Sequence, residues 1–117
     1  MSEITTIYHN PRCSKSRATM EILRGKRESL EVISYLETPP DREALETLLN
    51  QLGLQPRELM RTGEKIYAEL YLADEALTND ELIKAMLENP ILIERPIVIK
   101  NGKAMIARPP ESVIDIL

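Results

Sequence analysis

A single cysteine, Cys13, is the side chain of this sequence best suited to nucleophilic chemistry. It follows an apolar stretch and a turn, and it stands where a helix is expected to begin, so backbone N–H groups and the positive end of the helix dipole favour its anionic form. Arg12, Lys15 and Arg17 add positive charge close by. Such surroundings lower the pKa of a thiol and supply a reactive thiolate at neutral pH. A buried and inert cysteine is the alternative that the pattern alone leaves open.

Two polar residues near Cys13 could assist it. Ser16 stands where a Cys-x-x-Cys redox motif has its second cysteine, so no disulfide can form within this segment. The Ser16 hydroxyl could hydrogen-bond the thiolate from the first helical turn, or it could serve only as a helix cap. His9 could stabilise the thiolate as a cation or through a hydrogen bond, whereas its ordinary interpretation is a structural residue of the turn.

Three arginines that are distant from the cysteine in sequence suit an anionic substrate. They are Arg61, Arg95 and Arg108. Arg95 and Arg108 each precede a proline, which biases them toward extended or turn backbone at the ends of elements, where sites are commonly built. Guanidinium groups match tetrahedral oxyanions with paired hydrogen bonds. Converging on a thiolate, they would hold an oxyanion there, although a single arginine is more commonly a solvated surface residue.

The composition of the 117 residues argues against several classes of function. A net charge of −4 with neither Trp nor Phe leaves no basic stripe for nucleic-acid phosphates and few rings to stack on bases, so we expect no nucleic-acid partner. No apolar run reaches the length of about 18 residues that spans a membrane, and the first residues lack a signal-peptide pattern, so we expect no membrane association and a cytoplasmic location. One Cys and one His argue against a metal site.

The elements that position the cysteine begin with a strand, a helix and a second strand. β-Branched and aromatic residues predict a strand over residues 4–8, and an Asn-Pro pair marks the turn after it. Good helix formers predict a helix that begins at Cys13 or Ser14 and ends at Gly25. A second strand fits residues 30–36. This order predicts a parallel βαβ unit with a right-handed crossover.

The middle of the chain, about residues 41–89, is predicted to be helical. Leucines spaced i, i+3, i+4 and i+7 give one apolar helical face; they are Leu45, Leu48, Leu49 and Leu52. Asp41 is the expected N-cap of this helix, and Gly53 is its expected end. Thr78 begins a capping-box pattern for a later helix.

The end of the chain returns to strands. Residues 97–100 and 103–106 flank Asn101-Gly102, the strongest short hairpin signal. A last helix is predicted over residues 111–117. The sequence therefore predicts one α/β domain over residues 1–117, with the order β-α-β, helices, β-β-α and a helical insertion between the two halves.

Several segments together resemble the ArsC family of glutaredoxin-coupled arsenate reductases. They occur in order over nearly the whole chain, as His-Asn-Pro-Arg-Cys-Ser-Lys-Ser-Arg at 9–17, Tyr-Leu-Glu-Thr-Pro-Pro at 35–40, Glu-Leu-Met-Arg at 58–61, Asn-Pro-Ile-Leu-Ile-Glu-Arg-Pro-Ile-Val at 89–98 and Ala-Arg-Pro-Pro-Glu at 107–111. The resemblance implies a thioredoxin-like fold with a helical insertion, which agrees with the predicted order of elements.

The resemblance also implies roles for individual residues. Cys13 matches the nucleophile, His9 the residue associated with thiolate activation, and Ser16 the residue that hydrogen-bonds the thiolate. Pro96 falls where thioredoxin-like folds place a cis-proline facing the active loop. The expected substrate-binding residues are Arg61, Arg95 and Arg108, which match the family's oxyanion-site arginines, and Arg17, which lies close to the nucleophile in sequence. Known arsenate reductases of the family carry Gly-Thr where this chain has Ser14-Lys15.

The implied reaction reduces arsenate to arsenite through a covalent adduct on Cys13. The chain has no second thiol, so the reductant must come from outside, and the resemblance implies glutathione and a glutaredoxin. We expect no tightly bound cofactor, no metal and a monomer. Two alternatives are a glutathione-linked oxidoreductase that acts on mixed disulfides, and a regulator of the Spx type, which shares the fold and binds RNA polymerase. Ser16 removes the Cys-x-x-Cys switch that many such regulators use.

Overall fold

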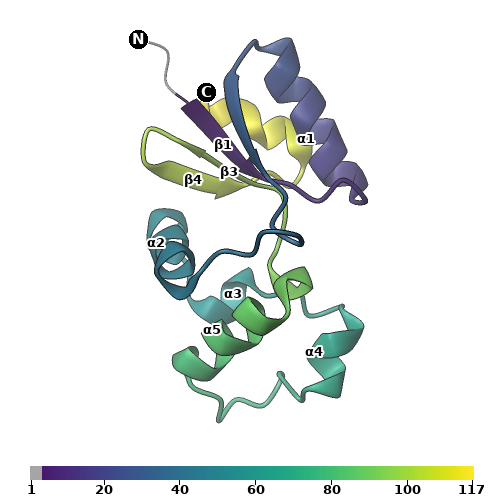
Figure 1. Cartoon of the computed structure of the whole chain (residues 1–117), viewed down its shortest axis with the longest axis vertical. Coiled ribbons are helices and arrows are strands. Elements are labelled where there is room, and N and C mark those ends of the chain that lie inside the picture. Colours follow the sequence, from purple (N-terminus) through teal and green to yellow (C-terminus); the bar gives the residue numbers. More distant parts are fainter. Residues whose placement is uncertain (1–3) are drawn as a thin grey trace. The chain divides into compact units, whose positions relative to one another are not determined.

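The computed structural model describes residues 4–117, which form two compact units (Figure 1). The first unit comprises residues 4–38 and 95–117, and the second is Pro39–Glu94. The predicted helical insertion falls inside the second unit, and the prediction of one domain over the whole chain stays a prediction. Within residues 4–117, every helix is too short or too polar to cross a membrane.

The first unit contains a four-stranded sheet with the order β2-β1-β3-β4. β1 (Ile4–Tyr8) pairs in parallel with β2 (Ser29–Ile33) and antiparallel with β3 (Ile97–Lys100). β3 pairs antiparallel with β4 (Lys103–Ile106). The helix α1 (Ser14–Gly25) connects β1 to β2. The predicted α/β class and the parallel βαβ unit are therefore confirmed.

Two element boundaries in the first unit differ from the prediction. β2 ends at Ile33, earlier than expected, because the chain turns at Ser34, whose carbonyl accepts two N–H groups of the following turn. The last element, η2 (Pro110–Ile116), is a 3-10 helix in place of the predicted α-helix. Its first turn closes with a bond from the N–H of Ser112 to the carbonyl of Pro109, the i to i+3 pattern of a 3-10 helix.

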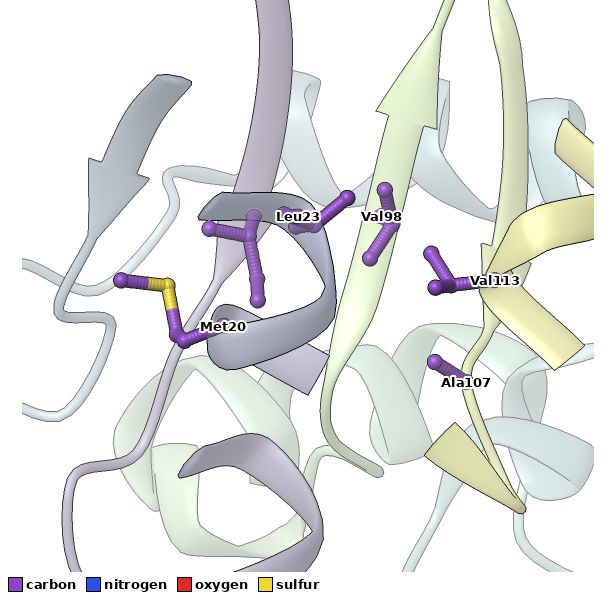
Figure 2. Packing of buried hydrophobic residues seen from close by; sticks show 6 residues of the cluster. Met20, Leu23, Val98, Ala107 and Val113 are labelled. Atoms are coloured by element: carbon purple, nitrogen blue, oxygen red, sulfur yellow. The ribbon is translucent and has the colours of Figure 1, made fainter. Parts of the chain in front are cut away.

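Apolar side chains of the first unit hold α1 in place. The buried cluster consists of Ile7, Met20, Leu23, Val98, Ala107 and Val113. Figure 2 shows the side chains of Leu23, Val98 and Val113 gathered between α1, β3 and η2, and α1 also packs directly against η2. Burying one such side chain contributes roughly 1.5–3 kcal/mol. This packing fixes α1 and with it the loop that carries Cys13.

The second unit is helical. It contains α2 (Arg42–Leu52), α3 (Pro56–Leu59), α4 (Lys65–Glu69), α5 (Asn79–Glu88) and the 3-10 turn η1 (Pro90–Leu92). The Asp41 carboxylate accepts the N–H of Ala44 at the start of α2, and Gly53 follows its end in the left-handed conformation. Thr78 and Glu81 form the capping box of α5. These predicted start and stop signals are confirmed.

Candidate active site

Cys13 is the N-cap residue of α1, with extended backbone at φ −94° and ψ 122°. Its N–H donates to the carbonyl of Asn10 at 3.0 Å, and its carbonyl accepts the N–H of Arg17 at 3.0 Å, as in the first turn of a helix. Cys13 is partly exposed. The cysteine therefore stands at a helix start, as predicted, and its thiol is not sealed in apolar packing.

The surroundings of the Cys13 sulfur favour its thiolate form. Burial raises the pKa of the thiol, but the backbone N–H of Ser16, the side chain of Arg95 and the backbone N–H of Lys15 together lower that pKa by more. These two N–H groups belong to the first helical turn, where they have no carbonyl partner within the helix. Because the net effect is a lowered pKa, a larger fraction of Cys13 than of an ordinary cysteine is present as the nucleophilic thiolate at neutral pH.

Two of the predicted arginines meet at the Cys13 sulfur. Arg95 is only 8% exposed, and its guanidinium hydrogen-bonds the sulfur and lowers the pKa of the thiol. The Arg108 Nη2 lies 3.7 Å from Sγ, and its Nε donates to the backbone carbonyl of Arg95 at 2.8 Å. The peptide bond before Pro96 is cis, as predicted, and so is the bond before Pro109. The site thus combines a thiolate with two guanidinium groups that can neutralise an anion.

Ser16 and His9 contact each other. Ser16 is fully buried, and its Oγ lies 2.6 Å from Nδ1 of His9 and accepts the N–H of Asn10 at 3.0 Å. These contacts of the Ser16 hydroxyl differ from the expected hydrogen bond to the thiolate. The group of Ser16 that favours the thiolate is its backbone N–H, and not its side chain. Burial lowers the pKa of His9, and the charges of Arg24 and Arg17 lower it further. The neutral form of His9 therefore predominates at pH 7, and the cations beside the sulfur are Arg95 and Arg108.

Arg17 lies near the nucleophile but contacts the loop. Its Nη1 donates to the carbonyl of Pro11 at 2.9 Å, and this contact is exposed. It braces the turn that leads into α1. Its expected role in substrate binding stays a prediction.

Arg61 belongs to the second unit and is surrounded by acidic side chains. Its Nη1 donates to Glu94 Oε1 at 2.6 Å, and its Nε lies 3.6 Å from Glu64 Oε1. Two backbone bonds fix the pair, from the Arg61 N–H to the carbonyl of Leu92 and from the Glu94 N–H to the carbonyl of Leu59. Sequence reasoning missed both glutamates, because no local pattern indicates the cross-chain pairing. The oxyanion role of Arg61 stays a prediction.

Replacing Glu94 with alanine is expected to destabilise the protein by about 1–2 kcal/mol, between the values typical of exposed and buried ion pairs. The side chains of Arg61 and Glu94 are 24% and 25% exposed, so removing one leaves the other partly desolvated without its closest partner. Urea unfolding measures the loss. Glu94→Gln keeps an acceptor for the guanidinium and should lose less; equal stability of Glu94→Ala and the wild type would contradict the prediction.

The residues described do not assemble a metal site. Among residues 4–117, no group of three or more His, Cys, Asp or Glu side chains is placed to hold a metal ion. The chemistry that this arrangement supports is attack by a thiolate on an electrophilic centre that carries negative charge.

Comparison with known proteins agrees with this chemistry. The family model described as ArsC family matches residues 8–116. The chain belongs to the ArsC family. Among its relatives, the arsenate reductase of Neisseria meningitidis serogroup A is 46% identical over 112 residues, which cover 95% of this chain and 96% of that protein. The uncharacterised protein YfgD of Escherichia coli K12 is 53% identical over 118 residues, which cover 100% and 99%.

A solved ArsC structure matches the fold closely. The structure of an arsenate reductase from Vibrio cholerae has a TM-score of 0.96 and 50% identity, with 100% of both chains covered. Together with the family match, this likeness confirms the thioredoxin-like fold that the sequence resemblance implied.

Proposed function

We propose that this ArsC-family chain reduces arsenate to arsenite with Cys13 as its nucleophile. One observation carries the proposal: a thiol of lowered pKa lies at the N-terminus of α1, and the guanidinium groups of Arg95 and Arg108 lie beside its sulfur. A nucleophile alone suits many reactions, whereas two cations beside it suit attack on an oxyanion. The relatives named arsenate reductase in Neisseria meningitidis and Vibrio cholerae give the identity of that oxyanion.

The first step forms a covalent adduct. The Cys13 thiolate attacks arsenic in dihydrogen arsenate, an S–As bond forms, and one As–OH group takes up a proton and leaves as water. Arsenic is still As(V) in this adduct. Arg95 and Arg108 offset the repulsion between the thiolate and the anionic substrate, and they stabilise the oxygen charge that develops.

The second stage transfers two electrons. Two thiol sulfurs must leave joined as a disulfide for As(V) to become As(III), which departs as arsenite. The chain has one cysteine, so at least one of these thiols comes from outside. In this proposal the external reductants are glutathione and a glutaredoxin, with no tightly bound cofactor, and the reaction takes place in the cytoplasm, where such thiols stay reduced.

The remaining site residues take supporting roles in the proposal. His9 and Ser16 hold the loop before α1, Arg17 braces it, and Pro96 sets the backbone next to Arg95. Arg61 is assigned to the oxyanion because its position in the sequence matches the family motif. We propose that the protein acts as a monomer.

An arsenate assay tests the function. The purified chain, with glutathione, a glutaredoxin and arsenate, is expected to form arsenite in a catalytic cycle, and to reduce a mixed disulfide of glutathione and cysteine far more slowly. Arsenite formation is followed chemically and glutathione disulfide by coupled NADPH oxidation. Faster reduction of the mixed disulfide than of arsenate would favour the glutathione-linked oxidoreductase instead. Tight binding to RNA polymerase that is independent of Cys13 would favour the regulator of the Spx type.

A further inference from the structure

Asn10 lies at the centre of the loop that carries the nucleophile, although it does not contact a substrate atom in any step above. It is only 3% exposed, which is unusual for an asparagine. Its side-chain Oδ1 accepts the N–H of Arg12 at 3.0 Å, and its carbonyl accepts the N–H of Cys13 at 3.0 Å. The first contact is an Asx turn, in which an asparagine side chain stands in for a backbone carbonyl.

A third contact connects Asn10 to the first turn of α1. Its N–H donates to the Oγ of Ser16 at 3.0 Å, and that hydroxyl is also 2.6 Å from His9 Nδ1. A neutral His9 can accept the hydroxyl proton of Ser16 at Nδ1. The buried Ser16 side chain is therefore held from two directions.

These contacts converge on the groups that face the sulfur. Ser16 supplies the backbone N–H that lowers the pKa of Cys13 the most, and the backbone N–H of Asn10 donates to the hydroxyl of that same Ser16. Asn10 also accepts the N–H groups of the successive residues Arg12 and Cys13, and these contacts help to set the extended backbone of the N-cap residue. Asn10 thus contacts both the backbone that leads into Cys13 and the residue whose N–H faces the Cys13 sulfur.

We propose that Asn10 is a positioning residue for the nucleophile: its side-chain amide fixes the loop so that the Cys13 sulfur faces the N–H groups at the start of α1. The proposal deepens the proposed function, since it rests on Cys13 as the reacting group. The backbone contacts of Asn10 survive any substitution, whereas the Asx turn needs the side-chain oxygen. Substitution of the side chain therefore tests its contribution directly.

The test measures the pH dependence of Cys13 alkylation by iodoacetamide in the full chain. Asn10→Ala is expected to shift the titration to higher pH and to slow alkylation at pH 7 by about two- to fivefold, since less of the thiol is ionised. Asn10→Ser offers a shorter acceptor for the same N–H and should lie between the alanine variant and the wild type. Asn50→Ala, which removes an exposed asparagine from the second unit, is the matched control and should leave the titration unchanged.

Folding and function are separated by two further measurements. Thermal unfolding followed by circular dichroism shows whether each variant is folded. If Asn10→Ala does not fold, the titration of Asn10→Ser decides the test. An unchanged titration in a folded Asn10 variant overturns the proposal. Absence of arsenate turnover in the wild type would reject the proposed function alone, because alkylation reports the thiol without arsenate.

Discussion

Replacing Cys13 with serine is expected to abolish arsenate reduction, lowering kcat/KM by about 10³-fold or more. A serine hydroxyl is close in shape to a thiol, but it is not ionised near neutral pH and its arsenate ester offers no sulfur for an external thiol to attack. The chain has no second cysteine that could substitute. The rate of arsenite formation with glutathione and glutaredoxin measures the loss.

Ser14→Ala is the matched control for Cys13→Ser. It removes the exposed neighbouring hydroxyl and leaves the thiol in place, so kcat/KM should stay within about twofold of the wild type. Circular dichroism establishes that both variants are folded. A folded Cys13→Ser protein that keeps a measurable catalytic cycle would exclude the adduct mechanism.

Replacing Arg95 with alanine is expected to raise the pKa of Cys13 and to lower kcat/KM for arsenate by about 10²-fold. The guanidinium hydrogen-bonds the sulfur and stabilises its negative charge, so without it less thiolate is present at neutral pH. The alkylation titration should move to higher pH, and the KM for arsenate should rise because one cation of the anion site is lost. Arg95→Lys keeps the charge without the planar fork and should recover only part of the activity.

Arg24→Ala supplies the control for charge alone. Arg24 is an exposed residue in the last turn of α1 and pairs with Glu21, so its removal changes the net charge equally while the sulfur keeps its contacts. The alkylation titration of Cys13 should be unaffected. A titration that moves by the same amount in both variants would show that long-range charge, and not the Arg95 contact, lowers the pKa of the thiol.

Short segments of sequence were sufficient to predict the fold wherever local contacts determine the structure. Asn101 and Gly102 take φ values of 55° and 74° and close the β3–β4 hairpin, as the Asn-Gly pair predicts. Thr78 caps α5 through the predicted capping box. The end of β2 was placed less well, because residues 34–36 have strand-like composition but lie in a turn.

The site was harder to predict, because it depends on contacts between distant segments. The position of Cys13 at a helix start followed from the order of strand, turn and helix. Arg108 is 95 residues away in sequence, and its segment reaches the loop through the pairing of β1 with β3 and of β3 with β4, and through the packing of η2 against α1. The direction of the Ser16 hydroxyl could not be read from spacing, since capping, thiolate contact and the observed bond to Asn10 all begin from the same helical turn.

The hydrogen bond from Arg108 Nε to the backbone carbonyl of Arg95 makes the two cations separable by mutation. A carbonyl is present whatever amino acid occupies position 95, so Arg108 keeps its support when the Arg95 side chain is exchanged. A series of substitutions at position 95 could therefore change the acidity of the Cys13 thiol while the Arg108 guanidinium keeps its place beside the sulfur. A displacement of the backbone just before β3 would instead carry both cations away from the sulfur together.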